Sequence, residues 1–293
     1  MENMCNICPR RCNVDRSVKT GFCGQKNVLR VARAAAHFWE EPCISGAGGS
    51  GTVFFSGCNL RCVFCQNSQI SSGGFGKDIS VKKLKEIYER LIDFGVDNIN
   101  LVTPTHFADL IIESLDEKLP VPVIWNSGGY DSVETIKKLD GKIDVYMPDF
   151  KYMNSDTAKK YSSAPDYPKV AVSAIKEMFN QVGKCSFDSD GMIEKGVLIR
   201  HLILPGNVEN TLDVIDWVSG NFNSGDVLFS LMRQYTPPAF DTGFEELSHR
   251  VTDEEYEKCE DYMYLAGIED GFVQDISSAE SEYTPPFNLE GVE

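Results

Sequence analysis

Three cysteines, Cys58, Cys62 and Cys65, form a C-x3-C-x2-C run directly after an apolar stretch of the chain. Such short spacings are too tight for most disulfides, but they suit thiolates that converge on a metal. Three thiolates can hold three irons of a cubane 4Fe–4S cluster and leave the fourth iron open to a substrate or cofactor. The alternative is a zinc knuckle that recruits its fourth ligand from elsewhere in the chain.

A second group of cysteines lies in the first 45 residues with the spacing C-x2-C-x3-C-x10-C. Its members are Cys5, Cys8, Cys12 and Cys23. Four thiolates can close a metal site completely, as in structural zinc or an auxiliary 4Fe–4S cluster, and the spacing leaves both open. The other three cysteines of the chain, Cys43, Cys185 and Cys259, are interpreted as ordinary thiols.

The elements that must position the Cys58–Cys65 run alternate between strands and helices. Strands are expected at residues 52–57, 98–103, 121–127, 143–150, 197–204 and 227–232, with a short strand at 272–275. Helices are expected at residues 80–94, 107–115, 131–139, 155–182, 209–218 and 253–266. This alternation predicts βα units and a parallel sheet. Six units are too few for a closed eight-stranded barrel, so we expect an α/β fold with an incomplete (β/α)6 barrel.

The predicted organisation has three parts. Residues 1–45 are a cysteine-rich metal-binding leader, residues 46–276 form the barrel, and residues 277–293 are a polar, loosely packed tail. The glycine-rich stretch 45–51 is expected to be a flexible joint. It matches the letters G-x-G-x-x-G, but it precedes a strand instead of following one, which excludes a dinucleotide fingerprint.

The first cysteine run resembles the C-x3-C-x-aromatic-C motif of the radical S-adenosylmethionine (SAM) enzymes, with Phe64 as the aromatic residue. Among these enzymes, the chain resembles relatives of pyruvate formate-lyase activating enzyme. The resemblance implies a 4Fe–4S cluster whose unique iron binds SAM. It further implies cleavage of SAM to methionine and a 5′-deoxyadenosyl radical, fed by a flavodoxin- or ferredoxin-type reductant.

The resemblance extends to the ends of two later strands. Met147, Asp149 and Lys151 match a Met-x-Asp-x-Lys pattern of such activating enzymes, and Asn126-Ser127 stands where the family has Asp-Thr. These positions imply a monovalent-cation site beside the SAM carboxylate, with Lys151 near the cofactor. A strand-end ion pair is the alternative for Asp149 and Lys151.

Further candidates stand at the ends of the second and fifth strands. The family's Gly-Gly-Glu turn is absent at the end of the second strand. Thr103 and Thr105 stand there instead, and they are expected to offer hydroxyls and carbonyls to the SAM ammonium group. His106 is either a proton donor or a structural histidine. Arg200, followed by His201, is either a carboxylate clamp for the cofactor or part of a salt bridge between strands.

The charge of the chain restricts its partners. Lys and Arg total 28 against 44 Asp and Glu, which gives a net charge of −16. Without a basic patch, such a protein should bind neither nucleic acid nor an anionic membrane surface. The first residues contain no apolar h-region and no run is long enough to span a membrane, so we expect no signal peptide and a cytoplasmic location.

The leading hypothesis is a radical SAM activase that installs a glycyl radical on a partner enzyme, or otherwise modifies a protein or peptide. The competing enzyme hypothesis is a small-metabolite substrate. A non-catalytic iron–sulfur electron carrier or zinc protein is the alternative of another class. The cysteine-rich leader and the Trp-Glu-Glu-Pro segment at residues 39–42 resemble a poorly characterised branch of activating-enzyme-like proteins.

Overall fold

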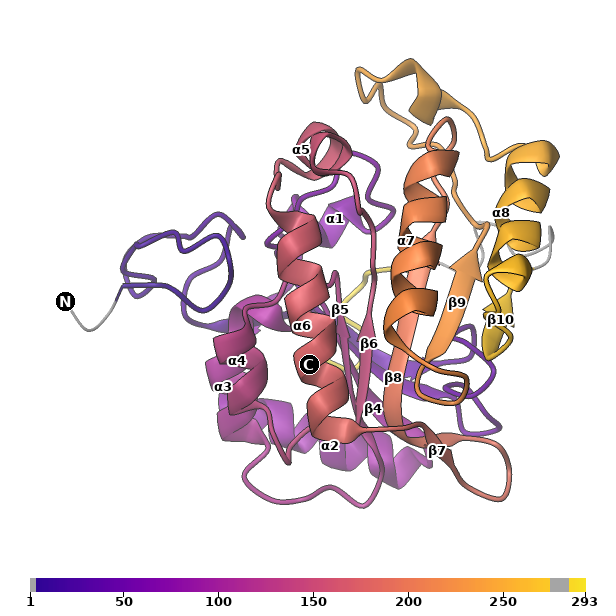
Figure 1. The fold of residues 1–293 in the computed structure, drawn as a ribbon. Coiled ribbons are helices and arrows are strands. Elements are labelled where there is room, and N and C mark those ends of the chain that lie inside the picture. The colour runs from indigo at the N-terminus through magenta and orange to yellow at the C-terminus, as the bar shows by residue number, and fades with distance from the viewer. Residues whose placement is uncertain (1–3, 275–284) are drawn as a thin grey trace.

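In the computed structural model, which describes residues 4–274 and 285–293, ten strands form one sheet (Figure 1). Their order is β10-β9-β8-β6-β5-β4-β2-β1-β3, and β7 pairs with β8 at the side. The strands are β1 (Leu29–His37), β2 (Ser50–Phe55), β3 (Lys77–Ile79), β4 (Asn98–Val102), β5 (Val123–Ser127), β6 (Val145–Pro148), β7 (Ser186–Phe187), β8 (Ile193–Leu202), β9 (Leu228–Met232) and β10 (Gly271–Val273).

The central part of the sheet is parallel, as predicted. Neighbouring strands from β2 through β4, β5, β6, β8 and β9 to β10 all pair in parallel, whereas β1 pairs antiparallel with β2 and β3. The six strands expected from the sequence correspond to β2, β4, β5, β6, β8 and β9. The short strand expected at residues 272–275 corresponds to β10, although residue 275 lies outside the described residues.

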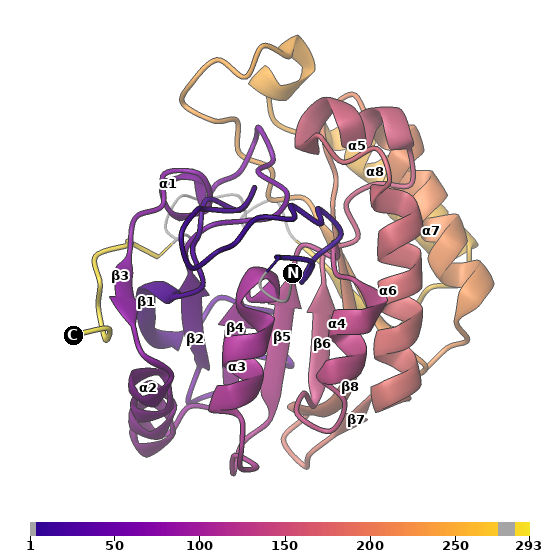
Figure 2. The ribbon, with the colours of Figure 1, turned by 90° about the vertical axis from the view of Figure 1, so that its left-hand side faces the viewer.

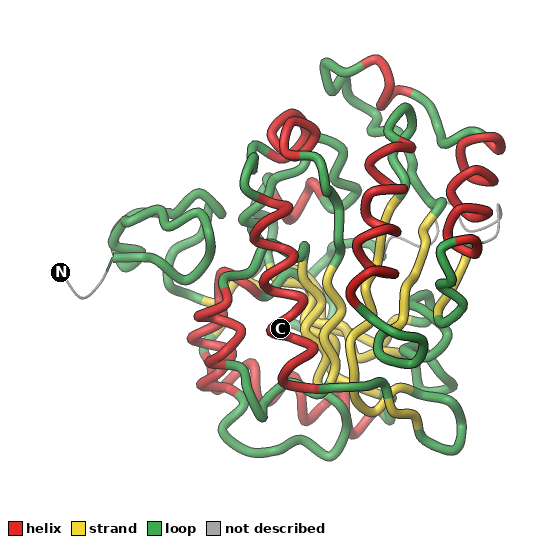
Figure 3. The backbone as a smooth tube through the Cα atoms, in the orientation of Figure 1, coloured by secondary structure: helices red, strands yellow, loops and turns green. Residues whose placement is uncertain are grey.

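Helices connect the parallel strands and cover one face of the sheet (Figures 1 and 3). They are α1 (Ser68–Ser71), α2 (Val81–Phe94), α3 (Ala108–Ser114), α4 (Val133–Lys138), α5 (Ser155–Ser162), α6 (Tyr167–Val182), α7 (Val208–Asn221) and α8 (Asp253–Leu265), with 3₁₀ turns η1 (Thr105–Phe107) and η2 (Glu245–Ser248). Within the described part of the chain, no helix has the length and apolar character needed to cross a membrane.

The boundaries of two predicted helices follow from local chemistry. Ser80 caps α2 by accepting a hydrogen bond from the backbone N–H of Lys83, and Gly95 ends that helix with φ of 93°. The single helix expected over residues 155–182 is instead two helices, α5 and α6. Ser163 adopts a left-handed conformation that ends α5, and a proline in the first turn of α6 begins the next helix.

Alternate residues of the strands face two different cores. Side chains such as Trp125, Tyr146 and Phe229 join the large core under the helices. Their strand neighbours, including Met147 and Leu228, face the inner side, where Ile44 from the loop after β1 packs on them. Figure 2 shows the strands side by side with their ends directed toward the N-terminal segment. The carboxyl ends of the strands therefore remain available for a site.

The structure corrects the expectation of a flexible joint at residues 45–51. Gly46 donates a backbone hydrogen bond to the carboxylate of Asp97 over 2.9 Å, and Asp97 donates one to the carbonyl of Gly49 over 2.9 Å. A Cβ atom on Gly48 would lie 2.1 Å from the carbonyl oxygen of Gly95. The glycines thus allow close backbone packing and do not form a linker.

Two further segments pack more closely than the sequence suggested. Residues 29–37, expected within the metal-binding leader, form β1 of the main sheet. A register shift between Val31 and Arg33 interrupts the alternation that would have predicted this strand. In the tail expected to be loosely packed, residues 277–284 lie outside the described residues. Residues 285–293 pack on β1. The backbone N–H of Ala34 donates to the carbonyl of Glu290, the N–H of Leu289 donates to the carbonyl of Ala32, and Val292 is buried.

Candidate active site

A cavity of about 220 Å³ lies at the carboxyl ends of the parallel strands, beside the loop that follows β2. The candidates that line it are Cys58, Cys62, Cys65, Thr103, Asn126, Ser127, Asp149, Lys151 and Arg200. These residues come from the cysteine loop and from the ends of β4, β5, β6 and β8. Parallel strands bring their carboxyl ends to one edge, which explains why residues so distant in the sequence meet here.

Each thiol of the cysteine run accepts a hydrogen bond. The backbone N–H of Leu60 donates to Cys58 Sγ over 3.3 Å. The hydroxyl groups of two serines donate to the other sulfurs, Ser162 to Cys62 Sγ over 3.0 Å and Ser71 to Cys65 Sγ over 3.3 Å. Such donors stabilise thiolates and influence the reduction potential of a cluster bound to them.

Burial makes these thiols poor acids when no metal is bound. Desolvation and the neighbouring Cys62 raise the pKa of Cys58 to about 12, and the same causes raise the pKa of Cys65. A positively charged cluster core would supply the charge that favours deprotonation.

The donor set fits a cluster with one open iron, because three thiols and three hydrogen-bond donors meet at one cavity. Across residues 4–274 and 285–293, however, no three His, Cys, Asp or Glu side chains stand in an arrangement that would already hold a metal ion. The structure thus brings the three cysteines to one cavity without placing them in ligand geometry.

The backbone of the cysteine loop is shaped by residues in the left-handed region. Gly57 has φ of 87°, and a Cβ there would lie 2.6 Å from the carbonyl oxygen of Cys23. Arg61 also has a positive φ, of 56°, which is uncommon for a residue with a side chain. Cys58 donates its backbone N–H to the same Cys23 carbonyl over 3.3 Å. The N-terminal segment therefore packs directly on the loop.

Arg10 of the N-terminal segment joins the cysteine loop to the end of α5. Its guanidinium donates to the carbonyl oxygens of Asn59 over 2.7 Å, Ser162 over 2.8 Å and Ser163 over 2.5 Å. It also lies 4.0 Å from the centre of the Phe22 ring. Since Ser162 in turn donates to Cys62 Sγ, Arg10 positions both the loop and one of its hydrogen-bond donors.

We expect Arg10→Ala to loosen the cysteine loop at a cost of about 2 to 4 kcal/mol, because several hydrogen bonds from a charged group are lost together. The variant should retain less iron per chain after anaerobic reconstitution, while its circular dichroism stays that of the wild type. Arg11→Ala is the matched control, because Arg11 is exposed and only approaches Glu134 at 3.8 Å. Equal iron contents in the two variants would contradict a positioning role for Arg10.

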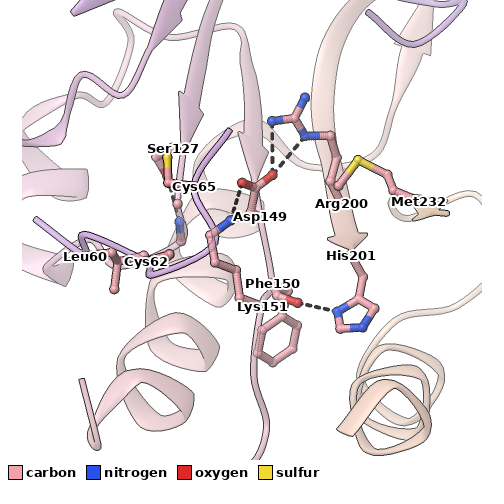
Figure 4. A network of polar contacts seen from close by, with 12 residues as sticks. Leu60, Cys62, Cys65, Ser127, Asp149, Phe150, Lys151, Arg200, His201 and Met232 are labelled. Atoms are coloured by element: carbon pink, nitrogen blue, oxygen red, sulfur yellow. Dashed lines mark hydrogen bonds and ion pairs between the residues drawn. The ribbon is translucent and has the colours of Figure 1, made fainter. Parts of the chain in front are cut away.

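Asp149 lies between two cations at the edge of the cavity (Figure 4). Lys151 Nζ donates to Asp149 Oδ2 over 2.8 Å, and Arg200 Nε donates to Asp149 Oδ1 over 3.0 Å. Burial opposes the charge of Asp149, but the two cations hold its pKa below its usual value. Asp149 in turn favours the protonated, positively charged forms of Lys151 and Arg200. Burial lowers the pKa of both groups, but the negative charges beside them, Asp149 foremost, raise the pKa by more.

Arg200 has further partners on the inner face. It donates to Asn126 Oδ1 over 2.9 Å and to Glu40 Oε2 over 3.1 Å, and it lies 3.8 Å from Glu41 Oε2. The structure thus contains the ion pairs that were the alternatives for Asp149, Lys151 and Arg200. It also places all three in the wall of the cavity, so the same groups are available to a bound ligand.

The remaining candidates divide into two groups. Thr103 lines the cavity with a strained φ of 59°, and the Ser127 hydroxyl donates to Asp131 over 2.5 Å. His106 does not line it: the ring is buried, contacts the Ser56 carbonyl oxygen at 2.8 Å, and burial lowers its pKa to about 3. This matches the structural alternative.

His201 also lies away from the cavity. Its Nδ1 atom contacts the carbonyl oxygen of Phe150 at 2.6 Å, and its Nε2 contacts the hydroxyl of Thr211 at 3.0 Å. Burial lowers its pKa to about 4. Since neighbouring residues of a strand point to opposite faces, Arg200 faces the cavity while His201 faces α7.

The four cysteines of the N-terminal segment lie near one another. Burial is the largest of the causes that raise the pKa of Cys8 to about 12, and the nearby Cys12, Cys23 and Cys5 contribute in the same direction, which reflects their proximity. Cys12 Sγ and Cys23 Sγ both lie within 3.6 Å of the position that a Cβ on Gly21 would occupy. As at the first run, the described residues do not stand in metal-ligand geometry.

Sequence reasoning missed several residues that contact the site. Met232 and Gln234 at the end of β9 line the cavity, and the end of a predicted sixth strand was a signal for both. Ser71 and Ser162 donate to cysteine sulfurs but carry no recognisable motif. Arg10 likewise belongs to no recognisable motif.

Comparison with protein families gives a match to the radical SAM superfamily over residues 52–218, more than half of the chain. An uncharacterized protein of Methanocaldococcus jannaschii is 32% identical over 268 residues, which cover 87% of this chain and 72% of that protein.

Among solved structures, SuiB of Streptococcus suis bound to S-adenosylmethionine matches with a TM-score of 0.50 and 14% identity, over 77% of this chain and 50% of SuiB. The chain thus spans about half the length of SuiB, and the likeness is one of fold. A domain of pyruvate-formate lyase-activating enzyme from Bacteroides vulgatus matches with a TM-score of 0.38 and 11% identity, over 67% of this chain and 91% of that domain.

Proposed function

The chain belongs to the radical SAM superfamily, and on that premise we propose that the cavity beside Cys58, Cys62 and Cys65 is where SAM is bound and cleaved. The observation that carries this proposal is that the three thiols share one cavity with Asp149, Lys151 and Arg200. We further propose that the curved sheet acts as an incomplete (β/α)6 barrel whose strand ends carry the reaction.

In this proposal the three cysteines would hold a 4Fe–4S cluster at the strand ends, with one iron left without a protein ligand. When bound, the cluster supplies the electron that cleaves SAM to methionine and a 5′-deoxyadenosyl radical, which removes a hydrogen atom from a substrate. Lys151 and Arg200 would bind the SAM carboxylate, and Thr103 and Asn126 would orient its amino group. The apolar side chains of Leu60 and Met232 in the cavity wall would exclude water.

For the substrate, we propose a protein or peptide, with activation of a glycyl-radical enzyme as the leading case. The support is the resemblance of the cysteine run and of Asp149 and Lys151 to the activating enzymes. An electron carrier is disfavoured, because a carrier normally has a protein ligand on every iron of its cluster.

The experiment that tests the SAM proposal is anaerobic reconstitution with iron and sulfide, followed by reduction with dithionite in the presence of SAM. We expect about four irons per chain at this site and formation of 5′-deoxyadenosine, measured by chromatography. A cluster that forms but never cleaves SAM would contradict the enzyme proposal and support the electron carrier. The activase proposal requires a glycyl-radical signal in electron paramagnetic resonance that appears only with a partner enzyme.

For Cys5, Cys8, Cys12 and Cys23 we propose a closed site, holding structural zinc or a second 4Fe–4S cluster. We expect Cys8→Ser to make the N-terminal segment protease-sensitive and to lower the yield, because metal binding would stabilise it. SAM cleavage by dithionite should remain measurable. Elemental analysis separates the metals: about four irons with one zinc indicates zinc, and about eight irons indicates a second cluster. Four irons, no zinc and a protease-resistant segment would exclude both.

A further inference from the structure

The segment from Asp149 to Lys151 follows the end of β6 and carries two of the charged side chains in the wall of the cavity beside the cysteines. Its first two N–H groups still pair with neighbouring strands. Asp149 donates to the carbonyl of Ser127 over 2.8 Å, and Phe150 donates to the carbonyl of Arg200 over 2.7 Å. The other backbone groups of the segment leave the sheet and need different partners, since buried N–H and C=O groups are nearly always hydrogen-bonded.

The hydroxyl of Tyr167, the first residue of α6, contacts this segment at two points. It accepts a hydrogen bond from the backbone N–H of Lys151 over 2.9 Å, and it lies 2.6 Å from the carbonyl oxygen of Asp149. The carbonyl oxygen of Gly128, in the loop after β5, lies 2.9 Å from the same hydroxyl. The fully buried Tyr167 thus joins the chain after β6 to the loop after β5.

Gly129 allows Tyr167 to come this close. Its φ is 72°, and a Cβ there would lie 2.4 Å from the carbonyl oxygen of Asp149 and 2.8 Å from the Tyr167 hydroxyl. The Tyr167 ring stacks on Tyr130 with centroids 5.9 Å apart and meets Tyr152 edge-on at 5.3 Å. The position of the hydroxyl is therefore defined by the packing around it.

Two side chains from β8 and α7 hold the other carbonyl groups of the segment. His201 Nδ1 contacts the carbonyl oxygen of Phe150 at 2.6 Å, and because a carbonyl only accepts, this nitrogen carries the proton (Figure 4). The side-chain amide of Asn210, which is 7% exposed, donates to the carbonyl of Lys151 over 3.0 Å. Both backbone polar groups of Lys151 are therefore held by side chains, its N–H by Tyr167 and its C=O by Asn210.

A fixed backbone has a consequence for the long side chain of Lys151. Ordering a lysine side chain costs conformational entropy, and a mobile backbone would add to that cost. The Lys151 ammonium group is held at its far end by Asp149 Oδ2 over 2.8 Å. With the backbone and the ammonium group both in place beforehand, a ligand of Lys151 binds without having to order the side chain.

We propose that Tyr167 and Asn210 are positioning residues of the SAM site, which keep the ammonium group of Lys151 in the cavity wall by holding its backbone N–H and C=O. Neither side chain lines the cavity, so both act through Lys151. This rests on the proposed function, in which Lys151 binds the SAM carboxylate.

The test is Tyr167→Phe, which removes the hydroxyl and keeps the ring. Formation of 5′-deoxyadenosine by the reconstituted protein with dithionite, at a series of SAM concentrations, gives KM and kcat. We expect the KM for SAM to rise about 10-fold, the scale on which the outer partners of a ligand act. The kcat should stay within about threefold of the wild type, because ground-state binding is what weakens. A merely structural role would reduce the folded fraction, which lowers kcat per chain and leaves KM unchanged.

Tyr146→Phe is the matched control. The Tyr146 side chain is fully buried on β6, and its hydroxyl donates to Gln181 Oε1 over 2.6 Å, on α6. This variant should keep the KM of the wild type. A second measurement, which needs no SAM, is hydrogen exchange followed by mass spectrometry on peptides that cover residues 149–151. The Lys151 amide should exchange at least about 10-fold faster in Tyr167→Phe than in the wild type or Tyr146→Phe.

If Tyr167→Phe does not fold, Asn210→Asp decides instead. It keeps the size of the side chain but replaces the donor to the Lys151 carbonyl by an oxygen, and a carboxylate is tolerated in the first turn of α7. The same rise in KM, about 10-fold, is expected. A folded variant with wild-type KM, or an equal rise in Tyr146→Phe, overturns the proposal. If the wild type forms no 5′-deoxyadenosine, the proposed function is wrong, and unchanged exchange of the Lys151 amide in Tyr167→Phe would still overturn the positioning role.

Discussion

Replacing Cys62 by alanine is expected to reduce 5′-deoxyadenosine formation to background while the protein remains folded. Removal of a residue that only contacts a metal ligand already lowers metal affinity or activity by about 10- to 100-fold. Loss of a ligand itself should therefore lower 5′-deoxyadenosine formation by more than about 100-fold. Cys62 lies on a loop beyond the strand ends, and its sulfur accepts one hydrogen bond, from Ser162. The stability change should therefore be small, about 1 kcal/mol.

The measurement combines iron content, the visible absorption of the cluster and the yield of 5′-deoxyadenosine after dithionite reduction. Cys185→Ala is the matched control, because that thiol is half-buried and contacts the Val197 carbonyl oxygen, and it does not line the cavity beside Cys58, Cys62 and Cys65. The control should keep both cluster and product. Normal product formation by Cys62→Ala would show that Cys62 is not a ligand of the cluster, and the proposed site would be wrong.

The parallel sheet was predictable because each of its strands is a short apolar run bounded by turn residues. The same regularity explains why Asn126, Asp149 and Arg200 could be grouped in advance: each ends such a run, and parallel strands end at one edge. The alternation of side chains along one strand adds a further distinction. It separates Arg200, which lines the cavity, from its neighbour His201, which does not.

What the sequence did not predict depends on contacts between distant segments. Arg10 reaches the cysteine loop and α5 only after the N-terminal segment has folded over them, and no local pattern encodes that distance. β1 was missed because its bulge interrupts the alternation of buried and exposed positions. Its position in the sheet is what brings Glu40 and Glu41 to Arg200.

Asp149→Asn is expected to destabilise the protein and to weaken SAM binding together. The substitution removes the negative charge between Lys151 and Arg200, so two buried cations lose their shared partner. Breaking a buried pair from one side costs about 3 to 5 kcal/mol. Arg200 retains Glu40 and Glu41, whereas Lys151 has no second carboxylate among its ion pairs in the described residues. Lys151 should therefore lose its position and SAM should bind about 10- to 100-fold more weakly.

The pH dependence of this variant follows from the lowered pKa of Asp149. A carboxyl whose pKa is lower in the folded than in the unfolded state stabilises the folded protein above the unfolded pKa of about 3.9, and it loses that contribution as the pH falls. The difference in free energy of unfolding between wild type and Asp149→Asn should thus be largest near neutral pH and shrink below about pH 4. Denaturant unfolding at several pH values measures it.

The double variant Asp149→Asn/Lys151→Met separates stability from binding. Removing the cation as well as its partner leaves no uncompensated charge at Lys151, so most of the lost stability should return. SAM binding should not return, because Lys151 is proposed to contact the SAM carboxylate directly. Calorimetric titration of SAM into both variants, beside the unfolding measurement, tests the two effects separately. Wild-type SAM affinity in the double variant would show that Asp149 and Lys151 form a structural ion pair and do not bind the cofactor.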